Sequence, residues 1–146
     1  MIWITKEQII EFQEKLIRKT GGSFGLRDEG GLESCIYSPL QSFDGKEFYS
    51  SIIDKASRVS YLLVNNHPFI DGNKRIGALT LLYILEENKI NYTFNDKELI
   101  DSYFSLAAGE ITYQQFDTWV KDHILDNEST KKLKNRNVNV LEIIIH

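Results

Sequence analysis

The chain has 146 residues, of which 42% are hydrophobic and 12% are aromatic. This length is typical of one compact domain, and the composition can bury roughly two-thirds of the unfolded surface, which excludes global disorder. The net charge of −4 does not favour binding of DNA, RNA or an anionic membrane over the whole surface. Any site for phosphate must therefore be local.

The cysteine content and the lengths of the apolar runs indicate in which compartment of the cell the protein is expected. The single cysteine, Cys35, excludes an internal disulfide, and we expect it to be a small buried hydrophobic side chain. No basic stretch leads into an apolar signal core at the N-terminus, and no apolar run approaches the roughly 20 residues that span a bilayer. These features predict a cytoplasmic protein with no membrane partner and no specific binding of nucleic acid.

The chain alternates between helical patterns and loops, without the βαβ pattern of a parallel sheet. Thr5 and Gln8 form a capping box, which predicts a helix from Thr5 to about Lys19. Apolar periodicity and a second capping box predict the other helices, at 32–37, 48–65, 76–85, 96–108 and 112–124. Residues 76–85 are apolar almost all round, which is typical of a central helix. The pattern predicts an all-α bundle around this helix.

Residues at helix ends and in the core have expected places. We expect Asn73 to cap the central helix, Asn88 to end it in the left-handed conformation, and Asp96 to cap the next helix. The glycine-rich segment 21–31 is expected to be a loop with backbone freedom. Aromatic residues at helical positions are expected to fill the core: Trp3, Tyr61, Tyr83, Phe104 and Phe116.

The most informative segment is residues 67–75, with the sequence HPFIDGNKR, just before the central helix. It combines a base, a carboxylate, a glycine, an amide and two cations. Asn73, Lys74 and Arg75 fall at the first turn of the helix, where free backbone N–H groups and the helix dipole favour an anion. Two cations there oppose the dipole, and a bound anion would remove that conflict. The segment predicts a phosphate site.

The residue types in this segment suit phosphoryl chemistry. Lys74 can act as a mobile charge on one phosphate while Arg75 grips another bidentately, and Gly72 allows close approach of the backbone. Asp71 can hold Mg²⁺, which bridges phosphate oxygens and takes few protein carboxylates. His67 can accept a proton from an attacking hydroxyl, which is the role of a general base.

Two residues of the segment have expected structural roles, since Pro68 stiffens the loop and Phe69 points into the core. A purely structural interpretation of the whole segment stays open at this point. His67 and Pro68 could merely end a helix, and Asp71 to Asn73 could form an ordinary turn beside a solvated Lys-Arg pair. The combination of residues in this order favours phosphate handling.

The segment HPFIDGNKR closely resembles the signature of the Fic/Doc (Fido) superfamily. The sequences GLRDEG at 25–30, LES at 32–34 and AAGEI at 107–111 look like the death-on-curing (Doc) branch of that superfamily. The resemblance covers roughly residues 1–125 and leaves 126–146 outside it.

The resemblance implies an α-helical Fido fold, in which the signature loop leads into the central helix and a flap within 21–31 covers the substrate cleft. It also implies a role for each residue of the signature. By resemblance, His67 is the general base and Asp71 is the Mg²⁺ ligand. The phosphate-binding anion hole then consists of Gly72, Asn73, Lys74 and Arg75.

Two positions depart from the Fic enzymes that transfer AMP. Those enzymes usually have glycine where this chain has Lys74, and a second arginine where it has Ala78. The charge of Lys74 would suit a reversed nucleotide with the γ-phosphate of ATP at the attack site, which is the Doc arrangement. Doc-branch toxins resemble kinases in outcome: they phosphorylate a translation elongation factor, and a small antitoxin inhibits them in trans.

The expected function is that of a bacterial toxin of a toxin–antitoxin pair. It would be an ATP- and Mg²⁺-dependent protein phosphotransferase, similar to a kinase, that acts on a protein hydroxyl. Two alternatives stay open: a Fic-type transferase of AMP or another nucleotide, and a catalytically silent Fido binding module. Lys74 favours the phosphotransferase over the nucleotidyltransferase, and the intact His67 disfavours the silent module.

The C-terminal segment has two parts. Residues 126–137 are polar, whereas 138–146 (VNVLEIIIH) are β-branched and apolar. We interpret the apolar end as a strand or short helix that folds back or pairs with a neighbouring chain. The expected organisation is a Fido domain at 1–125 followed by a tail at 126–146.

Overall fold

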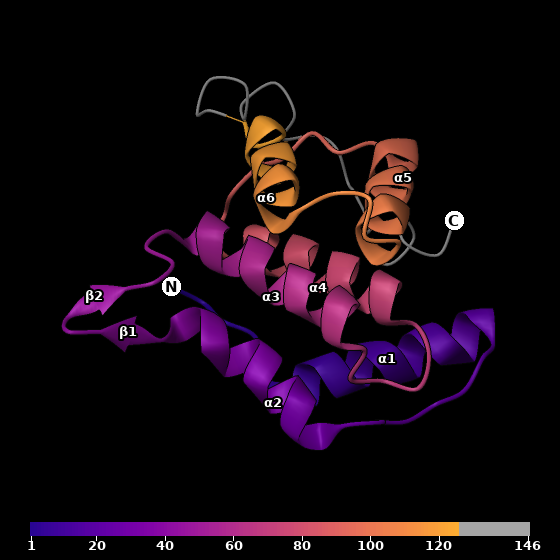
Figure 1. Ribbon diagram of the computed structural model, residues 1–146. Helices are drawn as coiled ribbons and strands as arrows, with labels where there is room; N and C mark the ends of the chain where they lie inside the picture. Colours follow the sequence, from indigo (N-terminus) through magenta and orange to yellow (C-terminus); the bar gives the residue numbers. More distant parts are fainter. Residues whose placement is uncertain (126–146) are drawn as a thin grey trace.

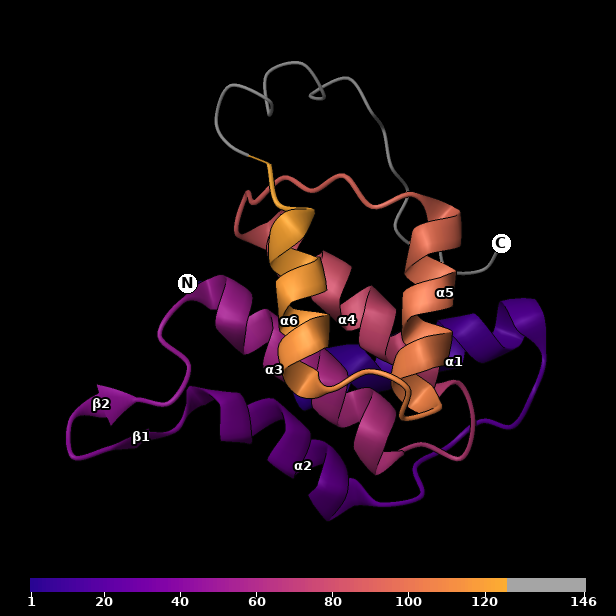
Figure 2. The ribbon, with the colours of Figure 1, turned by 45° about the horizontal axis from the view of Figure 1, so that its top comes forward.

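The computed structural model describes residues 1–125, and the expected tail at 126–146 lies outside the described residues. The described part is built mainly from helices: α1 (Lys6–Thr20), α2 (Glu29–Tyr37), α3 (Ile52–Asn66), α4 (Asn73–Glu87), α5 (Asp96–Ala107) and α6 (Tyr113–Asp122). Helices α3 and α4 lie side by side in the middle, with α1 and α2 on one side and α5 and α6 on the other (Figures 1 and 2). The predicted all-α class and its central helix are confirmed.

Helix starts follow the capping chemistry of the sequence. The predicted capping boxes are both present, at Thr5 before α1 and at Thr112 before α6. Helix α2 begins earlier than the predicted residue 32. The carboxylate of Asp28 accepts a hydrogen bond from the backbone of Gly31 at 2.9 Å, and this cap draws two glycines into the first turn.

Helix α4 is the central helix, and nine of its residues are buried: Ile76, Gly77, Ala78, Leu79, Thr80, Leu81, Leu82, Ile84 and Leu85. The observed caps of α4 differ from the expected ones. Gly72, not Asn73, is the N-cap of α4. Asn88 is its C-cap but has a φ of −96°, so it is not left-handed; the left-handed residue is Lys89, with a φ of 58°. The prediction for α5 was wrong by one residue, because Asn95 caps it.

The remaining elements are a short 3-10 helix η1 (Ser38–Leu40) and a hairpin of β1 (Ser42–Phe43) and β2 (Lys46–Glu47). The hairpin extends away from the helices (Figure 1). The turn signal at Asp44 and Gly45 forms it, with positive φ at both residues, as the tightest hairpin turns require. Within residues 1–125, no helix combines the length and apolar character needed to cross a membrane.

Most of the expected core is confirmed. Phe69 and Phe116 are buried, and so is Cys35, whose thiol pKa is raised to about 11 by burial. Trp3, Tyr61 and Tyr83 are partly buried and pack against the core. Phe104 is a correction, because its side chain is 58% exposed. It lies on the part of α5 that faces the first turn of α4, where it contacts Lys74.

Helices α3 and α4 approach closely at Gly77. The hydroxyl of Ser60 on α3 donates to the carbonyl of Gly77 at 2.7 Å and forms a further buried hydrogen bond with the hydroxyl of Tyr103. A Cβ atom at Gly77 would lie 2.7 Å from a methyl group of Val64 and 3.1 Å from the carbonyl oxygen of Ser60. A side chain at this position would therefore force the two helices apart.

We expect Gly77→Ala to lower the free energy of unfolding by about 1–3 kcal/mol, because overpacking outweighs the gain in helix propensity. Gly30→Ala is the matched control: Gly30 is also helical, and within residues 1–125 its added Cβ would meet only an oxygen of Asp28, at 3.8 Å. Urea unfolding followed by circular dichroism measures both. A Gly77→Ala protein as stable as Gly30→Ala would contradict the close packing of α3 and α4.

Candidate functional site

The predicted site residues all lie on the loop between α3 and α4 and on the first turn of α4. His67 ends α3 in the left-handed conformation, with φ 48° and ψ 58°, and its side chain is exposed. This conformation costs a residue with a side chain about 1–2 kcal/mol, and such residues cluster at functional sites. The loop ends at Gly72, which is also left-handed, with a φ of 84°.

Asn73 fixes the shape of the loop. Its side-chain oxygen accepts from the backbone N–H of Phe69, and its side-chain nitrogen donates to the carbonyl of Phe69, both at 3.0 Å. Phe69 is 1% exposed and Pro68 is also buried, so the middle of the loop is anchored in the core. The residues on either side of this anchor, including His67, are held at the surface.

The N-terminus of α4 has the properties of an anion site. The first backbone bond of the helix runs from the N–H of Ile76 to the carbonyl of Gly72, at 2.9 Å. The N–H groups of Asn73, Lys74 and Arg75 precede that bond, and among residues 1–125 no side chain caps this end. Free N–H groups together with the helix dipole attract phosphate.

The two cations differ in their surroundings. The ammonium nitrogen of Lys74 lies 3.9 Å from the ring centre of Phe104, over the exposed face of that ring. Arg75 is exposed. Within the described part of the chain, neither cation forms an ion pair with an acidic side chain. Both are therefore free to bind an anion at the start of α4.

Asp71 is exposed, and each of its oxygens accepts one backbone hydrogen bond. One oxygen accepts from Gly72 at 2.9 Å and the other from Ser23 at 3.3 Å. Each oxygen keeps a further lone pair. In residues 1–125 there is no group of three or more His, Cys, Asp or Glu side chains that could cage a metal. The donor set fits Mg²⁺, which binds through one or two carboxylates plus phosphate and water.

The glycine-rich segment, residues 21–28, lies along the loop. Leu26 and Phe69 form an isolated antiparallel β-bridge. The backbone N–H of Ile70 donates to the carbonyl of Gly25 at 3.0 Å, and the carbonyl of Pro68 accepts from Arg27 and Asp28. Residues 21–28 thus run beside the signature loop, while residues 29–31 belong to α2. That this segment acts as a flap stays a prediction.

Two residues that hold this arrangement were missed by the sequence analysis. Gln13 on α1 is fully buried, and its side-chain nitrogen donates to the carbonyls of Ser23, at 3.2 Å, and Asp71, at 3.3 Å. The side chain of Arg27 donates to the carbonyls at the end of α3. A glutamine on the apolar face of a helix is a signal for the first. The second lies in GLRDEG at 25–30, which resembles the Doc branch but does not indicate what its arginine contacts.

Gly22 permits the close approach of residues 21–28 to Asp71. It has a φ of 107°, and a Cβ atom there would overlap a carboxylate oxygen of Asp71. We expect Gly22→Ala to displace the segment and to speed amide hydrogen exchange at Ile70 about tenfold, a local cost of about 1.4 kcal/mol.

Gly21→Ala provides the matched control for that measurement. Gly21 also has a positive φ, of 80°, but within residues 1–125 no atom beyond its chain neighbours lies within 4 Å of its added Cβ. The difference between the two variants separates the contact with Asp71, together with a contact to a methyl group of Ile17 at 3.2 Å, from the cost of the backbone conformation. Equal exchange rates at Ile70 in the two variants would show that this contact does not place the segment.

Comparisons with known proteins identify the family of this chain. The family model described as the Fic/DOC family matches residues 3–85. The chain is 36% identical over 67 residues to the protein named Toxin Doc of Mycolicibacterium smegmatis, an alignment that covers 44% of this chain and about half, 52%, of that protein. It is 28% identical over 109 residues to the protein named Protein kinase doc of Escherichia phage P1, covering 75% of this chain and 85% of that protein. Because the family model matches more than half of its residues, this chain belongs to the Fic/Doc family.

Proposed function

We propose that this protein is a Doc-like toxin that transfers the γ-phosphate of ATP to a hydroxyl group of a protein. The observation that carries the proposal is the uncapped N-terminus of α4, with Lys74 and Arg75 on its first turn and His67 and Asp71 on the adjoining loop. The names of the two relatives, a toxin and a protein kinase, support the same class of activity.

Nucleotide binding would begin with the phosphates at the first turn of α4. The free N–H groups there can donate hydrogen bonds to phosphate oxygens. The guanidinium of Arg75 can bind one phosphate through two parallel hydrogen bonds. Lys74 has a flexible stem, so its ammonium can leave the face of Phe104 and meet a phosphate as a point charge. Bound phosphate would offset the repulsion between these cations and the helix dipole.

Asp71 would hold Mg²⁺ through the lone pairs that Gly72 and Ser23 leave unused. Bound Mg²⁺ would neutralise charge on the phosphate oxygens. The backbone contacts of Asp71 fix its carboxylate next to the start of α4. The chain thus supplies one fixed carboxylate and two cations to the same group of phosphates.

His67 would act as the general base. Its imidazole accepts the proton of the target hydroxyl, whose oxygen forms a bond to the γ-phosphorus while the bond from that phosphorus to the bridging oxygen breaks. ADP leaves, and the proton stays on His67. An exposed base suits a reaction in which the hydroxyl belongs to another protein. Phosphoryl transfer depends mainly on positioning and on charge neutralisation. His67, Asp71 and the two cations on the first turn of α4 are groups of the kinds that these two tasks need.

Lys74 and Ala78 support transfer of the γ-phosphate over transfer of AMP. Ala78 lies on α4 with only 4% exposure, so no second cation comes from this position. By the family resemblance, the target would be a translation elongation factor in the bacterial cytoplasm, and an antitoxin would inhibit the toxin in trans. The elongation factor and the antitoxin are thus the two partners of the proposed toxin.

The test supplies the pure protein and Mg²⁺ to a bacterial lysate with ATP that is labelled at either the γ- or the α-phosphate. The expected result is a protein band labelled from γ-labelled ATP only, and no band with His67→Ala. A band labelled from α-labelled ATP would show a nucleotidyltransferase instead. No His67-dependent band with either label would contradict the proposed activity.

Lys74→Gly is expected to lower γ-phosphate transfer about tenfold or more, because one charge-assisted contact to phosphate is lost. Lys97→Gly is the matched control, since Lys97 is exposed and occupies the same position in the first turn of α5. Initial rates with γ-labelled ATP measure both. An unchanged rate in Lys74→Gly would remove the main argument for a kinase-like reaction.

A further inference from the structure

We propose that Arg27 is a positioning residue for the transfer reaction, which holds the backbone of His67 in its left-handed conformation. The proposal rests on the proposed function, in which His67 is the base. Arg27 lies outside the signature loop, on the segment that runs beside it. It belongs to the Doc-like sequence GLRDEG at 25–30, which by itself assigns it no role.

The contacts of Arg27 converge on the point where α3 ends. Its Nε donates to the carbonyl of His67 at 2.7 Å, and its Nη2 donates to the carbonyl of Asn66 at 2.8 Å. Its backbone N–H donates to the carbonyl of Pro68, also at 2.8 Å. One residue thus binds three successive carbonyl groups across the turn. The two side-chain bonds are charge-assisted and satisfy carbonyls at a helix C-terminus, where a cation is also favoured by the dipole.

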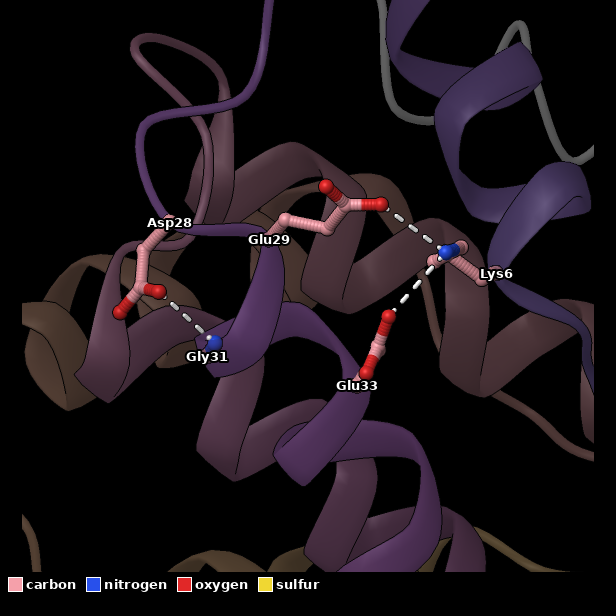
Figure 3. A network of polar contacts seen from close by, with 5 residues as sticks. All are labelled: Lys6, Asp28, Glu29, Gly31 and Glu33. Carbon is pink, nitrogen blue, oxygen red and sulfur yellow. Dashed lines mark hydrogen bonds and ion pairs between the residues drawn. The ribbon is translucent and has the colours of Figure 1, made fainter.

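Arg27 is itself held in place by its neighbours in the sequence. Asp28 caps α2 through its hydrogen bond to Gly31 (Figure 3). The ammonium of Lys6 on α1 binds Glu29 at 3.0 Å and Glu33 at 3.1 Å, which ties the first turns of α2 to α1 (Figure 3). The guanidinium therefore projects toward α3 from a fixed backbone.

The left-handed turn at His67 needs such support because it costs free energy for a residue with a side chain. Without the guanidinium, the carbonyls of Asn66 and His67 would turn to water, and φ of His67 could relax to the extended region, which a residue before proline such as His67 prefers. That rotation would re-aim the imidazole away from the phosphate site at α4. A small misplacement of a reacting group is enough to lower a rate strongly.

The chemistry of arginine suits this contact better than that of lysine. The guanidinium is planar and presents several N–H groups in a fixed fork, so it can bind two adjacent carbonyls at once. The single ammonium of a lysine keeps the charge but not the fork. Arg27 is exposed, so its replacement leaves the core intact. Arg27→Ala and Arg27→Lys therefore separate the fork from the charge without unfolding the domain.

The test compares Arg27→Ala and Arg27→Lys with Arg18→Ala, which removes an exposed arginine whose one ion pair within residues 1–125 is with Glu14 on the same helix. NMR scalar couplings and carbon shifts report φ of His67, and steady-state rates give kcat and KM for ATP. In Arg27→Ala we expect the left-handed signature of His67 to be lost, kcat to fall about tenfold or more, and KM to stay within about twofold. Arg27→Lys should be intermediate, and added guanidinium at low concentration should partly restore kcat of Arg27→Ala.

An unchanged left-handed signature of His67 in Arg27→Ala would overturn the proposal, whatever the rate. A kcat equal to that of Arg18→Ala would also overturn it. The two readouts separate this proposal from the proposed function. If the unaltered protein transfers no label, the proposed function fails, and the NMR comparison still decides whether Arg27 places His67.

Discussion

Replacement of His67 by alanine is expected to reduce phosphoryl transfer by a factor of about 10² to 10⁴, which is the usual contribution of a general base. The affinity for ATP is expected to stay within about twofold, because the phosphates bind at the N-terminus of α4 and not at the imidazole. Transfer rates with γ-labelled ATP and calorimetric titration with ATP measure the two quantities.

A second variant separates the base from the backbone conformation that His67 adopts. Asparagine tolerates the left-handed conformation better than alanine does but cannot serve as a base at neutral pH. His67→Asn should keep the turn at the end of α3 and should be as inactive as His67→Ala. Transfer by His67→Asn at the rate of the unaltered protein would exclude His67 as the base and would leave it a structural role only.

Replacement of Arg75 by alanine is expected to weaken both ATP binding and transfer. The variant loses a bidentate contact to phosphate of about 1.5–3 kcal/mol, which corresponds to roughly a 10- to 100-fold weaker affinity. Because Arg75 is exposed, solvent and salt screen part of this contribution, so the smaller effect is expected at physiological salt. Titration with ATP at two salt concentrations, beside transfer rates, measures it.

Arg75→Lys is the control for that experiment, because it keeps the charge and loses the planar fork. It should recover part of the affinity at low salt and less of the transfer rate. Since Arg75 contacts no acidic side chain in residues 1–125, neither variant should change the stability of the fold by more than about 0.5 kcal/mol. An Arg75→Ala protein with unchanged ATP affinity would show that the phosphates bind elsewhere.

The parts of the fold that depend on local chemistry could be predicted from the sequence. The capping boxes at Thr5 and Thr112 set helix starts through contacts within one turn, and the apolar run at 76–85 shows that α4 is buried on all sides. The predicted site residues are contiguous in the chain, so their proximity required no knowledge of the tertiary structure. Their assignment to phosphate combines these residue types with a feature of α4 that the structure adds, its uncapped first turn.

The features that depend on tertiary contacts could not be predicted in this way. Asn73 has the residue type of a cap, but its side-chain amide forms hydrogen bonds with the backbone of Phe69, because the loop folds back on Asn73. Phe104 is an aromatic residue at a core-like position, yet it is exposed beside Lys74. Gln13 and Arg27 act on a loop that lies far from them in the sequence. The spacing of residues along the sequence does not reveal contacts between residues so far apart in the chain.

Mass spectrometry of the modified target tests the central claim most directly. The target band from the lysate is purified after reaction with unlabelled ATP and Mg²⁺, and its intact mass is compared with that after reaction with His67→Ala. The proposed chemistry predicts an increase by the mass of one phosphoryl group that depends on His67. An increase by the mass of an adenylyl group, or a phosphoryl group that forms equally well with His67→Ala, would contradict it.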